Sequence, residues 1–169
     1  MSTPDYVAPE RVLTFALDSE MFAIDAQAVR EILEVPTITR VPSAPAFANG
    51  LVNVRGAIVP LTDLAEAFGI ERAAHSEDTR VIVIEAQIEG VPTTIGILAD
   101  KVHDVAAMEG ILIEETPSVG MRWRPDFIHA IARPRGAFVI LPDLEAIFAD
   151  ALQNIQGAFA ATSPTTAQR

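Results

Sequence analysis

The sequence predicts a mainly β protein made of two small, similar units with short helices. Short apolar runs rich in valine and isoleucine alternate with turn residues, which is typical of short strands. Prolines at 36, 42, 45 and 60 exclude a long helix there. The pattern then restarts after a charged stretch in the middle of the chain. Short strands with many turns favour small barrels or sandwiches over a parallel sheet.

The first elements form a hairpin followed by a helix. Residues 12–17 and 21–24 are apolar and flank Asp18-Ser19-Glu20, which predicts two strands and a turn. Residues 26–33 carry apolar side chains at 28, 29, 32 and 33, and this spacing predicts a short amphipathic helix.

A second hairpin and helix complete the first half. Residues 51–54 and 57–61 read as strands joined at Arg55-Gly56. Residues 63–68 then predict a short helix, with Thr62 or Asp63 as its cap and Gly69 as its terminator.

The second half begins after ERAAHSEDT, residues 71–79, a charged stretch that predicts a linker or exposed loop. As in the first half, the second half is expected to begin with a hairpin that is followed by a short helix. The expected elements are a strand at 80–86, a turn at Glu89-Gly90, a strand at 93–98, a helix at 99–106, strands at 127–132 and 137–141 around Arg133-Pro134-Arg135-Gly136, and a helix at 143–148.

The two halves are related by an internal repeat. Residues 55–59, RGAIV, return as RGAFV at 135–139, an offset of 80 that continues to Phe68 and Phe148. Val29, Glu31 and Ile32 are echoed by Val102, Asp104 and Val105 at an offset of 73. The difference between the offsets predicts an insertion in the second half, around 114–124.

Composition excludes several classes of function. The formal net charge is −11 and Lys101 is the single lysine, so nucleic acid and anionic lipid are poor partners. The chain has no cysteine, which excludes disulfides and thiolate chemistry. Residues 1–9 show no apolar run of a secretory signal, and apolar runs elsewhere are too short for a membrane helix. We expect a cytoplasmic protein without membrane insertion.

No catalytic constellation is visible. The chain lacks a glycine-rich phosphate loop and a Gly-x-Ser-x-Gly motif. His75, His103 and His129 are scattered, with no metal-binding spacing. Adjacent carboxylates at 77–78 and 114–115 are typical of hydrated surface loops. The residues therefore offer little sign of an active site, and we expect no metal and no cofactor.

Arg55 is the most distinctive polar residue. It lies at the tip of an apolar hairpin, before Gly56, which permits a positive φ. One interpretation is a solvated turn arginine. The other is an arginine held by a nearby acid, with Glu31 as the best candidate, that shapes a protein-binding surface; an exposed pair of this kind adds little stability.

Several segments together resemble CheW-like domains. They are LTFAL at 13–17, FAID at 22–25, VREI at 29–32, RVPSAPAF at 40–47, GLVNVRG at 50–56 and PLTDL at 60–64. The order and spacing match over about residues 10–152, and the Asn-x-Arg-Gly-x-x-x-Pro-x-x-Asp-Leu core is highly specific.

The resemblance implies a fold of two small five-stranded SH3-like β-barrels and a non-catalytic function. It implies a chemotaxis scaffold that couples the cytoplasmic tip of chemoreceptors to the regulatory domain of the histidine kinase CheA in extended arrays. By this resemblance, subdomain 1 spans about 11–70 and subdomain 2 about 80–152, with exchanged terminal segments. Residues 1–10 and 153–169 are then expected to be flexible.

The resemblance also implies the residues of a coupling surface. Val29, Glu31 and Ile32 match a segment that faces the receptor. A second group of candidates comes from the signature hairpin. A third group matches positions of the second barrel near the groove between the barrels. These further candidates are Gly50, Asn53, Arg55, Gly56, Gly96 and Val105.

Two departures from the family pattern leave alternatives open. Residues 121–124, MRWR, are unfamiliar, and residues 133–136 are unusually basic. The four arginines between 122 and 135 make either a basic patch for an acidic partner or a solvated, scattered set. The alternative functions are an adaptor of another chemosensory pathway, for surface motility or a non-motile output, and a small-molecule-binding β-barrel or enzyme.

Overall fold

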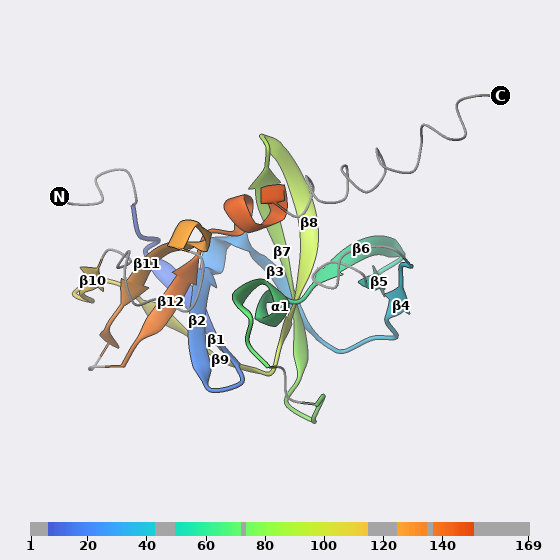
Figure 1. Ribbon diagram of the computed structural model, residues 1–169, viewed down its shortest axis with the longest axis horizontal. Helices are drawn as coiled ribbons and strands as arrows, with labels where there is room; N and C mark the ends of the chain where they lie inside the picture. Colours follow the sequence, from blue (N-terminus) through green and yellow to red (C-terminus); the bar gives the residue numbers. More distant parts are fainter. Residues whose placement is uncertain (1–6, 43–49, 72–73, 115–124, 135–136, 151–169) are drawn as a thin grey trace.

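Two curled β-sheets dominate the protein. The structure, a computed structural model, describes residues 7–42, 50–71, 74–114, 125–134 and 137–150 (Figure 1). The strands are β1 (Arg11–Leu17), β2 (Glu20–Asp25), β3 (Val29–Glu34), β4 (Thr39–Arg40), β5 (Gly50–Val54), β6 (Ala57–Thr62), β7 (Arg80–Ile88), β8 (Val91–Ala99), β9 (Lys101–Ala107), β10 (Ile113–Glu114), β11 (Ile128–Ala132) and β12 (Val139–Pro142). The helices are η1 (Ala26–Ala28), α1 (Leu64–Phe68), η3 (Pro125–Phe127) and one at 144–150.

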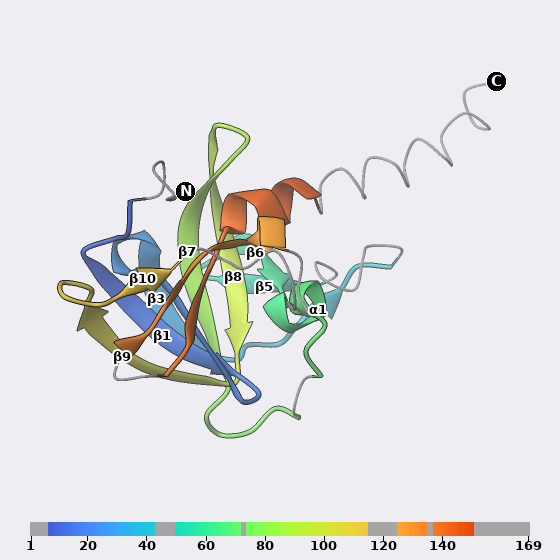
Figure 2. The same ribbon diagram turned by 60° about the vertical axis from the view of Figure 1, so that its left-hand side comes forward.

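The strand order of the two sheets is the same. Sheet A runs β10-β11-β12-β2-β1-β9, and sheet B, taken from its other edge, runs β4-β5-β6-β8-β7-β3. Each sheet thus has five longer strands and one strand of two residues. Each also joins the first hairpin of one half of the chain to the later strands of the other half, so neither sheet is continuous in sequence (Figures 1 and 2).

The repeat explains this correspondence. Hairpin β5–β6 with α1 occupies in sheet B the place that β11–β12 with the helix at 144–150 occupies in sheet A. Strands β3 and β9, which carry the second sequence echo, are the equivalent edge strands. The mainly β fold of two barrel-like units expected from the sequence is confirmed.

Two predicted helices are wrong. Residues 26–33 form only the single turn η1 before strand β3, and residues 99–106 lie mostly in β9. The apolar spacing misled because Ile32 is exposed in β3 while Glu31 takes a half-buried position beside Val29. Pairing of β3 with β7 and of β9 with β1 satisfies the backbone of these segments. Tertiary pairing therefore overrides the local pattern.

The predicted hairpins and the helix at 63–68 are confirmed. Asp63 caps α1 by accepting a hydrogen bond from the Ala65 N–H at 3.0 Å. Gly69 ends the helix in the left-handed conformation, with φ of 66°. In the predicted linker, residues 74–78 are exposed, whereas Thr79 is buried. Residues 1–6, 43–49, 72–73, 115–124, 135–136 and 151–169 lie outside the described part, so the predictions on the flexible ends, the insertion and Arg135 stay predictions.

A shared core joins the two sheets. Phe22 of β2 stacks on Phe15 at 5.8 Å between ring centroids and meets Phe68 of α1 at 5.2 Å. Phe68 in turn contacts Phe127 at 6.4 Å. Buried isoleucines of β7 and β8 complete this cluster, and each sheet encloses a smaller cluster of its own. Burying one such side chain contributes about 1.5–3 kcal/mol, so the shared core is the main link between the halves.

Candidate coupling surface

The hairpin β5–β6 ends in a two-residue turn made by Arg55 and Gly56. Their φ angles are 54° and 88°, and Val54 pairs with Ala57, as in a type I′ turn. The Asn53 carboxamide oxygen accepts a hydrogen bond from the Gly56 N–H at 2.9 Å. Glu89-Gly90 has the same geometry, so the positive φ of Arg55 belongs to the turn type and is not a sign of function.

Arg55 and Glu31 form a forked ion pair across sheet B. Arg55 Nε donates to Glu31 Oε2 at 3.0 Å, and Nη2 donates to Oε1 at 3.0 Å. Strand β3 and hairpin β5–β6 lie far apart in the strand order, so the pair connects parts of the sheet that only its curling brings together. Arg55 remains 80% exposed while Glu31 is 23% exposed. The pair therefore presents an oriented guanidinium to solvent.

The ion pair shifts the acidity of both groups. The hydrogen bonds that Glu31 accepts from Arg55 are the main reason why the pKa of Glu31 is lowered below the usual 4.5. Desolvation opposes them, and the positive charge of Arg55 makes the smallest contribution, which also lowers the pKa. The pKa of Arg55 is raised for the reciprocal reason, so Arg55 stays charged at every accessible pH. Because the pKa of Glu31 is lower in the folded state than in the unfolded state, the ion pair makes its full contribution to stability at pH values above the unfolded-state pKa. That contribution is lost as pH falls through the folded pKa.

We expect the Glu31 carboxyl to titrate with a midpoint below 4.5, measured by the ¹³C chemical shift of its Cδ as a function of pH. Arg55→Ala should move the midpoint back toward 4.5, because the hydrogen bonds that favour the carboxylate are gone. A wild-type midpoint at or above 4.5, or one unchanged by Arg55→Ala, would contradict the ion pair in solution.

Gly50 and Gly96 are buried and cannot contact a partner directly. A Cβ at Gly96 would lie 3.0 Å from Val81 Cγ1 and 3.3 Å from Leu61 Cδ1. One at Gly50 would lie 3.0 Å from Ile38 Cγ2. Both glycines therefore permit close packing beneath the surface. They lie opposite Leu61 of β6, in the hairpin that carries Arg55.

Val29, Ile32 and Val105 lie on the two equivalent edge strands. Ile32 of β3 is 42% exposed and Val105 of β9 is 40% exposed, so each can contact a partner. Val29 is half-buried against the shared core. Both edge strands have a register shift at the same place, between Val29 and Glu31 in β3 and opposite Leu13 to Phe15 in β9.

The sequence analysis missed an apolar face beside Arg55. Ile58 of β6 is 64% exposed, pairs with Asn53 and lies next to the exposed Pro60. Its equivalent at the offset of 80, Phe138, is 57% exposed. The internal repeat could have indicated this face, because Ile58 and Phe138 are large apolar residues at equivalent, outward-facing positions of the two hairpins.

Of the four arginines between 122 and 135, Arg133 is the one that lies in the described part of the chain. Arg133 Nε lies 2.9 Å from Glu114 Oε2, and the Arg133 guanidinium stacks over the Phe138 ring at 4.6 Å. Its charge is thus compensated. Arg122, Arg124 and Arg135 lie outside the described residues, as do Met121 and Trp123.

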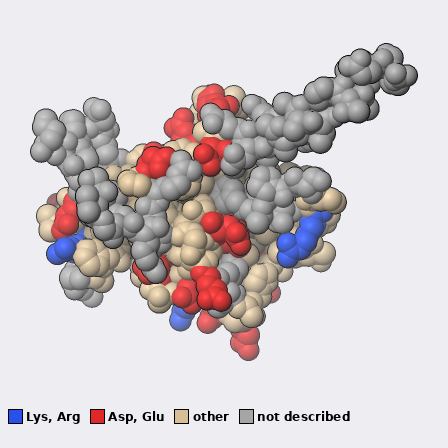
Figure 3. All heavy atoms as spheres, viewed as in Figure 1, with Lys and Arg blue, Asp and Glu red and all other residues tan. Residues whose placement is uncertain are grey.

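Most charged side chains on the face in Figure 3 are acidic. Figure 3 shows carboxylates spread over one face with few basic side chains among them. Within the described ranges, no three His, Asp or Glu side chains are grouped as ligands for a metal ion. No helix among the described residues is long and apolar enough to cross a membrane.

Comparison with known proteins decides the family. The model of the CheW-like domain family matches residues 11–152, most of the chain. The chain belongs to the CheW-like family. Among solved structures, it is similar to the scaffolding protein TtCheW of Thermoanaerobacter tengcongensis, with a TM-score of 0.73 and 31% identity over 85% of this chain and 90% of the other. This CheW-like architecture is the one described above.

Curated relatives agree with this assignment. The chain is 28% identical to a chemotaxis protein CheW of Rhizobium meliloti over 81% of its length and 86% of the relative. It is 29% identical to chemotaxis protein CheW of Klebsiella aerogenes, over 82% and 81%. It is also 26% identical to protein PilI of Pseudomonas aeruginosa, over 69% and 64%.

Proposed function

We propose that this CheW-like protein is a non-catalytic chemotaxis scaffold in the cytoplasm that couples chemoreceptors to the histidine kinase CheA. Membership of the CheW-like family over residues 11–152 is the observation that carries the proposal. The likeness to a scaffolding protein of known structure supports it. The partners are the cytoplasmic tip of the receptor and the kinase's regulatory domain; neither nucleic acid nor a membrane is among them.

Rigid transmission is the mechanism that the geometry supports. Arg55 is fixed by Glu31 through the fork and by the Asn53–Gly56 hydrogen bond at its turn. Ile32 and Val105 offer apolar contact on the edge strands, above a core shared by both sheets. A change in receptor conformation that shifts one strand can be transmitted through this core to the opposite barrel. A scaffold couples two sites in this way.

A pull-down tests the proposal directly. The purified full chain is mixed separately with a receptor cytoplasmic fragment and with the kinase regulatory domain, each tagged. We expect the chain to be retained by both. Retention by neither would overturn the proposal and favour a small-molecule-binding β-barrel, whose ligand a thermal-shift screen of metabolites would then seek.

Arg55→Ala and Glu31→Ala are expected to reduce receptor-dependent kinase activation by more than about fivefold while the protein stays folded. The double variant Glu31→Arg with Arg55→Glu should recover part of the loss, because it restores the attraction with its polarity reversed. Kinase activity in reconstituted arrays and circular dichroism of each variant provide the measurements.

Arg133→Ala is the matched control for this prediction. Arg133 forms another exposed ion pair, with Glu114, but it follows β11 of sheet A and is not among the coupling candidates. It should leave activation unchanged. Wild-type activation by both Arg55→Ala and Glu31→Ala, or equal losses with Arg133→Ala, would remove Arg55 and Glu31 from the coupling surface.

An adaptor of a different chemosensory pathway, for surface motility or a non-motile output, is the alternative function. An adaptor for a chemosensory system other than flagellar chemotaxis would have the same fold and the same coupling geometry. Deleting the gene and scoring swimming and surface motility separately distinguishes the two.

A further inference from the structure

A cavity of about 290 Å³ opens where the two sheets meet. Its wall combines the end of β2 and the N-terminal segment before β1 with residues from β7, β11 and β12. This volume is at the lower end of the range for ligand pockets, roughly 300–1,000 Å³, so it suits a short segment of chain better than a large cofactor.

The cavity runs along the edge of strand β7. Four consecutive residues of β7, from Ile84 to Gln87, line it. Side chains alternate between the two faces of a strand, so a cavity that touches four residues in succession lies beside the strand and not over one face. The backbone of β7, and not only its side chains, therefore borders the space.

No strand of the described residues pairs with this edge of β7 beyond Ile84. Residues 80–88 of β7 pair with β8 on one side along the whole strand. On the other side β3 pairs with β7 only as far as Val29 opposite Ile84. Within the described part of the chain, β7 is thus open from Glu85 to Ile88, and its peptide groups on that side can accept another extended chain.

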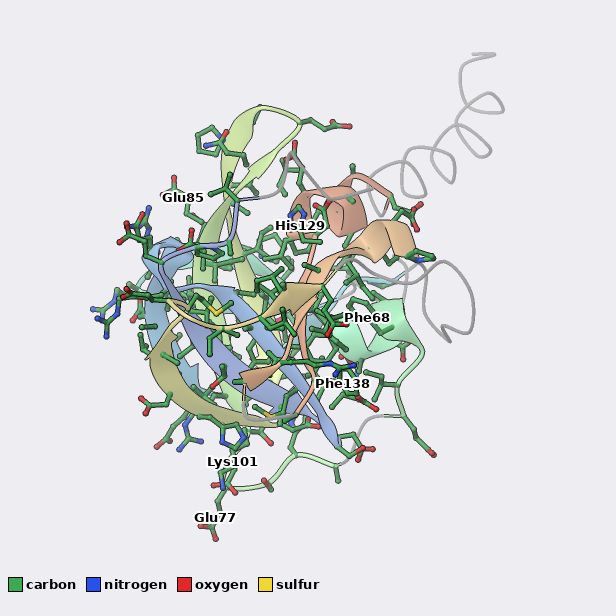
Figure 4. All side chains as sticks on the ribbon, turned by 90° about the vertical axis from the view of Figure 1, so that its left-hand side faces the viewer. Phe68, Glu77, Glu85, Lys101, His129 and Phe138 are labelled. Atoms are coloured by element: carbon green, nitrogen blue, oxygen red, sulfur yellow. The ribbon has the colours of Figure 1, made fainter. Side chains whose placement is uncertain are left out.

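The charges around the cavity select the occupant. The lining includes four carboxylates, of Asp25, Glu85, Asp143 and Glu145, and one histidine. Glu85 is paired with Arg30, and Asp143 lies 3.6 Å from His129, but Glu145 is exposed at the rim. Figure 4 shows Glu85 and His129 at the same end of the molecule, opposite Lys101 and Glu77. A cationic segment is attracted here and an anionic one repelled.

From the cavity, the open strand edge and this charge, we propose that the chain binds an extended basic segment of a partner protein by strand addition to residues 85–88 of β7. The segment's backbone pairs with β7, one set of its side chains enters the apolar part of the cavity at Ala28 and Leu144, and its arginines or lysines meet Glu145 and Asp25. This site goes beyond the proposed scaffold function and needs neither receptor nor kinase.

The test uses the full chain and a labelled probe peptide of alternating valine and arginine, nine residues long, with blocked ends. Fluorescence anisotropy measures binding, and amide chemical shifts locate it. We expect saturable binding with shifts at the amides of residues 85–88. The same peptide with glutamate in place of arginine, or with proline at its centre, should not bind, because charge or backbone pairing is lost.

Glu145→Arg and Glu66→Arg separate a specific site from general attraction to an acidic protein. Both are exposed glutamates in the first turn of a helix, and only Glu145 borders the cavity. Glu145→Arg should weaken binding of the arginine peptide at least about tenfold, and Glu66→Arg should not. Absent binding, equal effects of the two variants, or binding without shifts at residues 85–88 would each overturn the proposal.

Discussion

Phe22→Ala is expected to lower the free energy of unfolding by about 3–5 kcal/mol, the usual effect of removing a fully buried phenylalanine. Phe22 has no solvent exposure and contacts both Phe15 and Phe68. It comes from sheet A, whereas Phe68 belongs to α1, which follows β6 of sheet B. The cavity would therefore open at the junction of the two sheets. Chemical denaturation followed by circular dichroism measures the change.

Phe138→Ala is the control for this prediction, because it removes the same side chain from an exposed position. Its effect should be within about 0.5–1 kcal/mol, since it loses mainly the contact with Arg133. Wild-type protein should unfold in one transition, as both sheets share one core. Equal effects of the two substitutions, or separate unfolding of two halves, would show that the junction is not the stabilising centre.

Gly96→Val is expected to destabilise the fold by about 1–3 kcal/mol through overpacking. The first added atom already lies 3.0 Å from Val81 Cγ1 and 3.3 Å from Leu61 Cδ1. Gly96 also accepts, through its carbonyl oxygen, a buried hydrogen bond from the Thr62 hydroxyl at 2.9 Å. Leu61 pairs with Gly96 where β6 and β8 meet, so a larger side chain pushes apart the strands that carry the signature hairpin. The midpoint of thermal unfolding reports the loss.

Thr94→Val controls for the introduction of valine in the same strand, because Thr94 is exposed. It should change stability by no more than about 0.5 kcal/mol. Since Gly96 is buried, any loss of coupling in Gly96→Val should follow the fraction of folded protein. A fully folded Gly96→Val variant that fails to couple would instead place Gly96 in the binding surface itself.

Local signals in the sequence predicted the hairpins and α1. Arg55-Gly56 and Glu89-Gly90 were predicted as two-residue turns. In the structure both residues of each turn adopt a positive φ. Asp63 and Gly69 bracket α1 as cap and terminator. These features depend on neighbours in the chain, so the sequence alone suffices to place them.

The segments at 26–33 and 99–106 could not be placed from local signals. Their apolar spacing suits a helix, but each segment becomes an edge strand because a strand from elsewhere in the chain, β7 or β1, offers it a backbone partner. Helix propensity is a weak preference that such pairing overrides. The information was non-local, and the internal repeat held part of it, since the two errors fall at equivalent places.

The candidate site divides in the same way. The sequence left two interpretations of Arg55 open, a solvated turn arginine and a pair with Glu31, and the structure has the pair. The burial of Gly50 and Gly96, the exposure of Ile58, and the contact of Arg133 with Phe138 were not visible. Each depends on which face a strand turns to solvent, and that is set by the partner strands.

By itself, the sequence determined a mainly β chain with a repeated hairpin and cap, an acidic surface, no thiol chemistry and membership of the CheW-like family. The tertiary structure alone decided that each sheet combines strands from both halves, that Glu31 reaches Arg55 around a curled sheet, and that β7 keeps an open edge beside a cavity. The physical reason is that turns and caps arise from adjacent residues, whereas strand partners and buried faces arise from contacts between residues far apart in the chain.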